Sequence, residues 1–131
     1  MRSIAGVSVR NGRVFVARRA RGGPMGGTWE FPGGKLEPGE SDAEAIVREF
    51  DEEFALRVAP GPTIGESGFI NGVKPYELAA VMVEFDGEPP ALREHDEYRW
   101  VGAEELVALE LSDSDRSLLA FVLPLLVDRV E

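Results

Sequence analysis

The region between Gly34 and Leu56 carries acidic side chains at spacings that suit a divalent metal ion. Three glutamates, Glu49, Glu52 and Glu53, stand close together in this region. An α-helix turns by about 100° per residue, so the three carboxylates would share one side of a helix. Mg²⁺ prefers oxygen ligands and usually keeps positions open for water and substrate phosphates. The pattern therefore predicts a metal-dependent hydrolase of phosphoanhydride bonds.

A simpler interpretation of this acidic cluster is a solvated helix face, which is what most charge runs on helices are. That interpretation leaves Glu49 and Glu53 at positions i and i+4, where like charges destabilise a helix by about 0.2–0.5 kcal/mol. The cluster also lies near the negative end of the helix dipole, where cations are favoured. Conflicts of this kind are typical of functional sites, and a bound dication would remove this one.

Residues around the acidic cluster keep a regular spacing, which reads Gly34-x5-Glu40-x7-Arg48-Glu49-Phe50-x-Glu52-Glu53-x-Ala55-Leu56. This run resembles the Nudix box, G-x5-E-x7-R-E-U-x-E-E-x-G-U with U an aliphatic residue, and it matches every charged position. Phe50 is aromatic at an aliphatic position, and Ala55 replaces the final glycine. If Ala55 ends the helix with a positive φ, alanine costs about 1 kcal/mol at that position.

The resemblance implies an α/β protein with the Nudix fold, an α/β/α sandwich whose mixed β-sheet carries the catalytic loop and helix on one face. We expect a single domain over residues 1–131, with the box at residues 34–56. The resemblance also implies two or three Mg²⁺ ions, with Mn²⁺ as a possible substitute. The expected metal ligands are the carbonyl oxygen of Gly33 and the carboxylates of Glu49, Glu52 and Glu53.

The other charged box residues are expected to act around these ligands. Arg48 is expected to orient a carboxylate rather than to touch the substrate, and Gly34 and Glu40 to support the junction of loop and helix. Glu49 and Glu53 are expected to be catalytic. A carboxylate that binds metal and one that takes a proton from water look alike in sequence, so the general base stays open.

A segment outside the box, Glu94–Trp100, resembles the E-H-x-E-hydrophobic-R-W segment of many small Nudix enzymes. Glu94 takes the position that adds a metal ligand or a base from outside the helix. The alternative is a polar loop before a strand, with Glu97 as the next candidate. We expect His95 at the surface or in a supporting role, and Trp100 in the core.

The run Trp29–Lys35 resembles the corresponding run of MutT-type nucleoside triphosphate pyrophosphohydrolases. In such enzymes an arginine at the end of the second strand often contacts the phosphates. Arg18 or Arg19 would do so here, unless both only offset the acidity of the surface. Lys35 would steady a phosphate as a point charge.

A polar residue just before the last helix reads the base in MutT-like enzymes, and Asp115 takes a comparable place. An ionised aspartate accepts hydrogen bonds from amino groups such as that of cytosine, and a protonated one also donates. The alternative is helix capping, which needs no ligand, by Ser112, Asp113 or Ser114. Phe69 and Tyr76 would offer a stacking surface for the base or pack in the core.

Composition limits the classes of function. The chain has 131 residues, 44% of them hydrophobic, and a net charge of −10, so a general grip on nucleic acid polymers or acidic lipids is not expected. It has no cysteine and a single histidine, which excludes thiolate chemistry and multi-histidine metal sites. The N-terminus lacks a signal-peptide pattern and the apolar run Leu118–Val127 is too short to span a membrane. We expect a soluble, cytoplasmic monomer or homodimer.

The elements that must position these residues follow from hydrophobic periodicity and turn residues. Asn11-Gly12 and Asn71-Gly72 are typical of hairpin turns. Ser41 and Glu44 form a predicted capping box that begins the acidic helix. The expected strands and extended pieces are Ile4–Val9, Arg13–Arg18, Trp29–Phe31, Thr63–Ile70, Tyr76–Phe85 and Tyr98–Val101. The expected helices after the acidic one are Ala103–Leu109 and Ser114–Arg129, the latter with Leu118, Leu119, Val122, Leu125 and Leu126 inward and a kink at Pro124.

These observations together predict a MutT-type hydrolase that converts a nucleoside triphosphate, standard or oxidised, to the monophosphate and pyrophosphate. The same box also serves enzymes that cleave dinucleoside polyphosphates, nucleotide sugars or capped RNA, which remain alternatives. A non-catalytic module that senses a nucleotide is the alternative from another class. A pure binding module would not need all three metal-binding carboxylates.

Overall fold

The computed structural model describes residues 1–23, 26–71 and 74–126. Its elements are β1 (Arg2–Val7), β2 (Val9–Arg10), β3 (Arg13–Arg19), β4 (Trp29–Glu30), β5 (Gly33–Lys35), α1 (Asp42–Phe54), β6 (Ala59–Asn71), β7 (Lys74–Glu84), β8 (His95–Val101), α2 (Ala103–Ala108), α3 (Asp113–Arg116), α4 (Leu119–Val122) and the 3₁₀-helix η1 (Leu123–Leu126). The predicted turn at Asn71-Gly72 includes a residue outside these ranges. Within them, no helix is long and apolar enough to cross a membrane.

The described strands form two four-stranded sheets. The first has the order β5-β1-β7-β6, in which β1 and β7 are parallel and the other pairs are antiparallel. This confirms the predicted mixed sheet. In the second, β3 pairs antiparallel with β2, β4 and β8. The expected single strand over residues 4–9 is divided at Ser8, whose carbonyl accepts from the N–H of Phe15, so the chain passes there from one sheet to the other.

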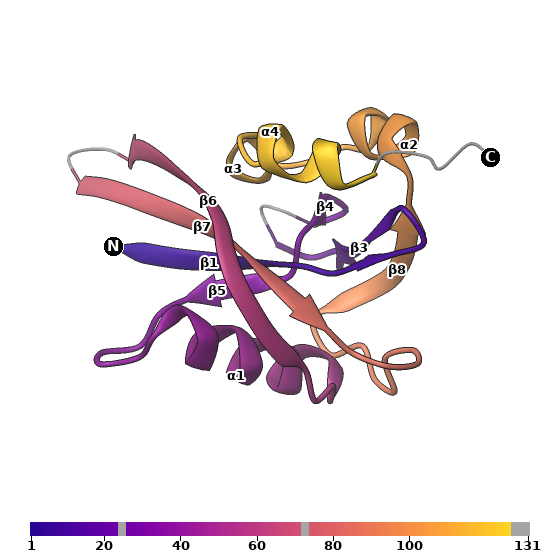
Figure 1. The fold of residues 1–131 in the computed structure, drawn as a ribbon, viewed down its shortest axis with the longest axis horizontal. Coiled ribbons are helices and arrows are strands. Elements are labelled where there is room, and N and C mark those ends of the chain that lie inside the picture. Colours follow the sequence, from indigo (N-terminus) through magenta and orange to yellow (C-terminus); the bar gives the residue numbers. More distant parts are fainter. Residues whose placement is uncertain (24–25, 72–73, 127–131) are drawn as a thin grey trace.

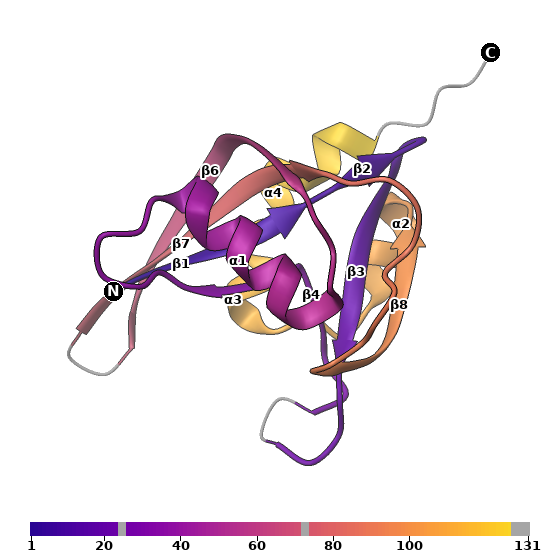
Figure 2. The same ribbon diagram turned by 90° about the horizontal axis from the view of Figure 1, so that it is seen from below.

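Helices cover the sheets on both sides (Figure 1). The helix α1 lies on one side, and Figure 2, seen from below, shows it in front of β1, β6 and β7. The helices α2, α3 and α4 lie on the other side. Strand β3 supplies both hydrophobic cores, because Val14 and Val16 pack with the α2–α4 side and Phe15 and Ala17 with the α1 side. A strand buried on both faces is expected to be apolar at successive positions, as this one is.

The N-terminus of α1 is fixed by the predicted capping box. The Ser41 hydroxyl accepts from the N–H of Glu44 at 3.1 Å, and the Glu44 carboxylate accepts from the N–H of Ser41 at 2.9 Å. The buried face of α1 contains four apolar residues at helical spacing, Ala45, Ile46, Phe50 and Phe54. Glu49 then lies against Gly34 of β5, and Glu53 lies near His95 of β8.

The strand β6 is longer at its start than predicted. We expected this strand to begin at Thr63, but β6 begins at Ala59 and contains Pro60 and Pro62. The register between β6 and β7 shifts between Pro60 and Thr63 and again between Thr63 and Gly65. Because β6 is at the edge of its sheet and irregular there, it tolerates residues that cannot donate a backbone hydrogen bond.

The prediction of one long C-terminal helix is wrong within the described residues. The chain forms α3, α4 and η1 in succession, and Leu125 is 38% exposed rather than inward. The Ser117 hydroxyl donates to the carbonyl of Ser114, which offers the backbone an alternative to a continued α-helix. Pro124 lacks the N–H that an α-helical hydrogen bond would need.

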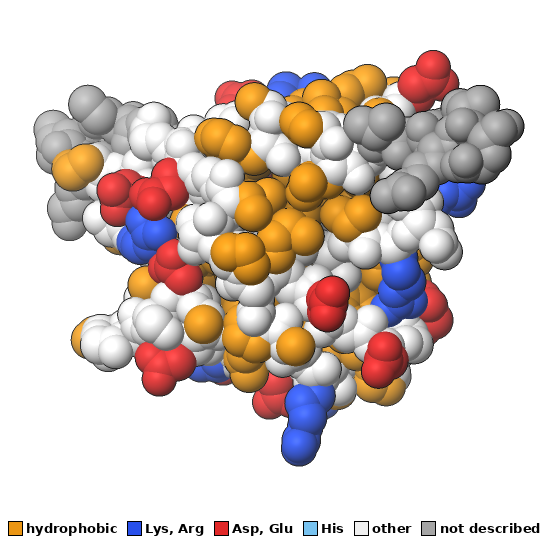
Figure 3. Space-filling model, viewed as in Figure 1, with side chains coloured by type: hydrophobic (Ala, Val, Ile, Leu, Met, Phe, Trp, Pro, Cys, Tyr) orange, Lys and Arg blue, Asp and Glu red, His pale blue; other side chains and the backbone are white. Residues whose placement is uncertain are grey.

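The short helices still pack closely on the mixed sheet. The Phe121 ring lies against the backbone of Gly65 in β6, where a Cβ atom would overlap the ring. Figure 3 shows hydrophobic side chains gathered on this face between β6 and the helices above it.

We predict that Ala55→Gly stabilises the protein. Ala55 ends α1 in the left-handed region, with φ 56° and ψ 32°, and its N–H bonds the carbonyl of Asp51. Glycine adopts this conformation without steric cost, so the free energy of unfolding should rise by about 1 kcal/mol. Urea unfolding followed by circular dichroism measures the change. A lower unfolding free energy for Ala55→Gly would contradict this assignment.

Candidate active site

Two carboxylates of α1, Glu49 and Glu53, lie together in a partly closed environment. Their side chains are 12% and 5% exposed. The two carboxyl groups are within hydrogen-bonding reach of each other. Among the described residues, Glu53 Oε1 is buried with no hydrogen-bond partner. An unpaired buried carboxylate oxygen is costly, so this pair is suited to hold either a proton or a cation.

Burial is the main cause that raises the pKa of Glu53 well above its ordinary value, and the charges of Glu49, Glu30 and Glu94 add to it. The pKa of Glu49 is raised as well, again mainly by burial and with a contribution from Glu52 and Glu94, although the charge of Arg48 opposes the shift. Desolvation and like charges therefore act in the same direction on both groups. A divalent cation nearby would favour the charged forms and so lower both pKa values.

The loop before α1 approaches the carboxylates through two glycines of β5. A Cβ atom on Gly34 would overlap the carboxylate of Glu49, and a Cβ atom on Gly33 would overlap the carbonyl of Ile4 in β1. Close packing against backbone, rather than an unusual φ, therefore requires glycine at Gly33, whereas a side chain at Gly34 would displace the Glu49 carboxylate. Gly34 brings backbone within contact distance of the Glu49 carboxylate.

Arg48 ties the loop to the helix. Its Nε and Nη2 donate to the two carboxylate oxygens of Glu40 at 2.7 and 2.8 Å, and Nη2 also donates to the carbonyl of Lys35 at 3.0 Å. The bidentate pair lowers the pKa of Glu40 to about 2, with the Arg48 hydrogen bond as the main cause. The Arg48 Nη1 lies 3.6 Å from Glu49 and 3.4 Å from Glu52. Arg48 thus contacts four carboxylates of the box, since Glu37 is also 3.7 Å from its Nε, and it does not line the pocket beside the loop.

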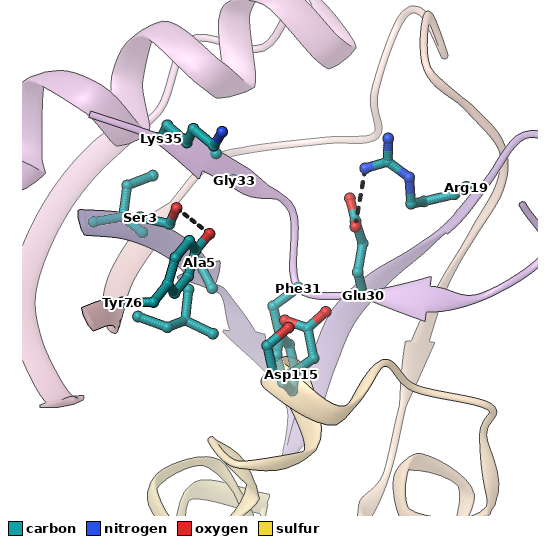
Figure 4. Close-up of a pocket in the computed structure, with 13 residues that line it drawn as sticks. Ser3, Ala5, Arg19, Glu30, Phe31, Gly33, Lys35, Tyr76 and Asp115 are labelled. Atoms are coloured by element: carbon teal, nitrogen blue, oxygen red, sulfur yellow. Dashed lines mark hydrogen bonds and ion pairs between the residues drawn. The ribbon is translucent and has the colours of Figure 1, made fainter. Parts of the chain in front are cut away.

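A pocket of about 240 Å³ opens beside the two glycines (Figure 4). Lys35 lies on one side of it, Arg19 and Glu30 on the other, and Asp115 between them. Tyr76 belongs to the wall near Lys35, and its hydroxyl lies 2.6 Å from that of Ser3. Of the two arginines at the end of β3, Arg19 lines the pocket, whereas Arg18 donates to Asp96 at 2.7 Å.

Asp115 is buried in this pocket, with 8% of its surface exposed. Burial, followed by the charge of Glu30, raises the pKa of Asp115 to about 7, against hydrogen bonds from the Ser112 hydroxyl and the Phe31 backbone. Ser112 caps α3 by accepting from the N–H of Asp115 at 3.3 Å. Because Ser112 supplies the cap, capping does not account for the buried Asp115 carboxyl group.

The structure adds two residues that the sequence did not single out as central. Glu30 accepts from or donates to His95, with 2.8 Å between Oε2 and Nε2, and its other oxygen is 3.3 Å from Arg19. The same His95 Nε2 lies 3.9 Å from Glu53 Oε1. Glu30, Glu53 and His95 offer ligand atoms within 4.8 Å of one another. Of the two places expected for His95, the surface is wrong, because the residue is only 4% exposed and its ring stacks on Phe54. For Glu30, the signal in the sequence was a charged residue between the aromatic residues Trp29 and Phe31.

The remaining candidates are less enclosed. Glu94 is exposed, yet its charge contributes to the raised pKa of Glu49 and Glu53. Glu52 is 53% exposed. Glu97 is paired with Arg99 at 2.9 Å, which removes it from the carboxylate pair.

The aromatic candidates divide in the same way. Trp100 is half-buried against the α1-side core, and the Arg10 guanidinium lies 4.2 Å from the centre of its ring. The side chain of Phe69 lies outside the described residues.

The family model for the NUDIX domain matches residues 1–122. The chain belongs to the Nudix family. A Mycobacterium tuberculosis protein with the provisional name 8-oxo-dGTP diphosphatase 2 is 38% identical over 120 residues, covering 89% of this chain and 84% of that protein. The CTP pyrophosphohydrolase of Escherichia coli is 32% identical over 117 residues, covering 88% and 86%. The solution structure of the E. coli ORF135 protein superposes with a TM-score of 0.83 at 30% identity, covering 95% and 89%.

These similarities confirm the predicted Nudix fold and the predicted enzyme class, a hydrolase of phosphoanhydride bonds. The site also fits the divalent metal that this class of chemistry uses. Its donors are carboxylate oxygens, the type that Mg²⁺ and Mn²⁺ accept, and one of them, Glu53 Oε1, is buried without a protein partner in the described part of the chain.

We predict that removal of divalent cations makes stability strongly dependent on pH. A raised carboxyl pKa means that the folded apoprotein binds more protons than the unfolded chain, so its stability falls as the pH rises above the ordinary carboxyl range. Mg²⁺ at about 100 times its Kd should restore about 2.7 kcal/mol at pH 8. Thermal unfolding with and without a chelator, from pH 5 to 9, measures this.

The matched variants for this experiment are Glu53→Gln and Asp51→Asn. Glu53→Gln should weaken both the pH dependence and the response to Mg²⁺, because the amide carries no charge to bury. Asp51 is on the same helix but exposed, so its substitution should change neither. Equal Mg²⁺ stabilisation of wild type and Glu53→Gln would contradict the placement of the metal.

Proposed function

We propose that this protein hydrolyses a nucleoside triphosphate, standard or oxidised, to the monophosphate and pyrophosphate, with Mg²⁺ as cofactor and Mn²⁺ as a substitute. The observation that carries the proposal is the buried Glu49–Glu53 pair beside a pocket lined by Arg19, Lys35 and Asp115. The pocket supplies groups for phosphates and for a base, and the carboxylate pair that would hold a cation lies next to it, because Glu49 contacts Gly34 of the pocket wall. The names of the curated relatives support the same substrate class.

The metal ligands in this proposal are Glu49, Glu52, Glu53 and the carbonyl oxygen of Gly33, with Glu94 adding a ligand or acting as the base. Divalent ions bound there supply neutralisation of phosphate charge and acidification of bound water. Arg19 and Lys35 carry the positive charge of the pocket walls and would hold phosphate oxygens. Arg48 and Glu40 keep the loop and helix in register.

The reaction is a substitution at phosphorus. The oxygen of a water molecule forms a bond to phosphorus, the bond from that phosphorus to the bridging oxygen of the leaving group breaks, and one water proton passes to a carboxylate. Glu53 and Glu94 are the candidates for that carboxylate. A raised pKa, as burial gives Glu53, makes a carboxylate a stronger proton acceptor near neutral pH. Pyrophosphate leaves and the nucleoside monophosphate remains.

A hydrolase of dinucleoside polyphosphates, nucleotide sugars or capped RNA is the alternative, and a non-catalytic nucleotide sensor is a further one. The panel experiment below separates them. A cytoplasmic location and a monomeric or homodimeric state are part of this proposal.

Glu53→Gln should abolish most turnover while preserving the fold. The amide can neither bind a cation as a carboxylate does nor take a proton, so kcat should fall by about 10²–10⁴-fold. The assay measures pyrophosphate and phosphate release from CTP, dCTP, dGTP, 8-oxo-dGTP, a dinucleoside polyphosphate and ADP-ribose, with and without Mg²⁺. Asp51→Asn is the control on the same helix. Near-normal turnover of Glu53→Gln, or preferred cleavage of a substrate other than a triphosphate, counts against the proposal.

Asp115→Ala should reduce the preference among bases rather than turnover in general. Loss of a buried hydrogen bond to the base should cost the preferred substrate about 10–100-fold in kcat/KM. Because burial raises the pKa of Asp115 to about 7, the wild type should favour bases with an amino group more strongly at pH 8 than at pH 6.

The control for this variant is Asp113→Ala, an exposed residue of the same short helix. The measurement is the ranking of the triphosphates by kcat/KM at both pH values. An unchanged ranking in Asp115→Ala would remove Asp115 from base recognition and leave hydrolysis itself untouched.

A further inference from the structure

His95 lies where the substrate pocket meets the carboxylate pair. Its Nε2 is 2.8 Å from Oε2 of Glu30, which lines the pocket beside Arg19, and 3.9 Å from Oε1 of Glu53 on α1. We propose that His95 is a positioning residue that holds the Glu30 carboxylate in the pocket wall, against Arg19 and apart from Glu53. This inference rests on the proposed function, because it assigns His95 a part in placing the substrate.

The His95 ring is held firmly enough for this role. Its side chain is 1% exposed, and it stacks on Phe54 with ring centres 5.1 Å apart and planes inclined by 13°. The other partner of Glu30 is Arg19, whose side chain is 42% exposed and whose Nη1 is 3.3 Å away. Exposed ion pairs fix a geometry weakly. The buried imidazole is therefore the contact that fixes the direction of the Glu30 carboxylate.

The surroundings of the ring also decide which nitrogen carries the proton. Nδ1 is buried and has no hydrogen-bond partner among the described residues, whereas Nε2 faces the Glu30 carboxylate. An orphaned N–H in a protein interior is rarer than an under-used acceptor. The geometry thus places the proton on Nε2, which donates to Glu30.

The same three residues, Glu30, Glu53 and His95, have ligand atoms close enough to surround a cation. A histidine that binds a metal through one nitrogen almost always donates its other ring N–H to a fixed acceptor. Nδ1 lacks such an acceptor in the described part of the chain. The contacts therefore favour a hydrogen-bond donor over a metal ligand at His95.

Loss of the hydrogen bond from His95 would affect two carboxylates of like charge, those of Glu30 and Glu53. The charge of Glu30 is among the causes that raise the pKa of Glu53, so the two carboxylates repel each other. Without the Nε2–H donor, Arg19 would be the only partner of the Glu30 carboxylate among the described residues. The pocket wall would then lose its fixed geometry, which should appear first in substrate binding.

Steady-state kinetics of His95→Phe, His95→Gln, Glu30→Ala and the double variant His95→Phe/Glu30→Ala test the proposal. Phenylalanine keeps an aromatic ring beside Phe54 but removes the donor, so kcat/KM should fall about 10–100-fold, mainly through KM. Glutamine offers an amide N–H in place of Nε2–H and should recover most of the loss. If His95 acts through Glu30, the double variant should be no worse than Glu30→Ala alone.

The control is Asp96→Asn, the exposed neighbour of His95, which is paired with Arg18 on another surface. Additive losses in the double variant would overturn the proposal, as would equal losses in His95→Gln and His95→Phe with unchanged unfolding midpoints. A higher Mn²⁺ concentration for half-maximal activity in His95→Gln would also overturn it, because that result identifies a metal ligand.

A second measurement uses the wild type and does not depend on activity. His95 is the only histidine of the chain, so a long-range ¹H–¹⁵N spectrum reports its ring alone. We expect a proton on Nε2 that exchanges slowly with water, and a shift of that resonance in Glu30→Ala. A proton on Nδ1, or a spectrum unchanged by Glu30→Ala, would overturn the proposal. Failure of the wild type to hydrolyse any triphosphate would instead overturn the proposed function, with the hydrogen bond still decided by the spectrum.

Discussion

The site depends on two acidic side chains that the fold buries with little positive charge beside them. In the described part of the chain, Glu49 shares Arg48, 3.6 Å away, with Glu40 and Glu52, and Glu53 has no arginine or lysine partner. Packing of Ala45, Ile46, Phe50 and Phe54 into the core fixes the rotation of α1. That rotation carries Glu49 against Gly34 of β5 and Glu53 toward His95 of β8, where both side chains are largely shielded from water. Desolvation there penalises both charges. Burial of the hydrophobic face of α1 thus places two carboxylates in surroundings that penalise their charges.

The loop that contains Gly33 and Gly34 brings backbone close to one of these carboxylates, that of Glu49. Because Gly34 has no side chain, the Glu49 carboxylate can lie against the backbone there, in the place that a Cβ atom would occupy. The pairing of β5 with β1 holds the loop in place, since Ala5 is opposite Gly33 and Ile4 opposite Gly34. The loop therefore lies on a sheet strand and not on a free turn. A cation that enters meets donors already fixed in position, which lowers the cost of ordering them on binding.

Local patterns predicted the parts of this arrangement that are themselves local. The Ser41 capping box follows from spacing within a few residues, and the sequence left open whether Ala55 takes the positive φ that the structure shows. The pairing of Glu30 with His95 depends on tertiary structure: Glu30 is opposite Ala17 on one edge of β3, and His95 is opposite Arg19 on the other. The register of the β3–β8 pair shifts between Arg18 and Arg19, and these two side chains lie in different places. The hydrophobic periodicity of the sequence does not predict that shift of register. The sequence therefore could not decide which of the two arginines lines the pocket.

The distribution of positive charge explains why the pair stays uncompensated. Arg48 is the cation nearest the box carboxylates, and its two strongest hydrogen bonds go to Glu40, 2.7 and 2.8 Å away, while Glu49 is 3.6 Å from it. Had Arg48 formed that bidentate pair with Glu53, the buried charge would be neutralised within the protein and a metal ion would gain little by binding. Glu40 instead holds Arg48 at the edge of the site, as its lowered pKa indicates. The half-buried Arg48–Glu40 pair steadies the loop, and the carboxylates of Glu49 and Glu53 are left to bind a cation from solution.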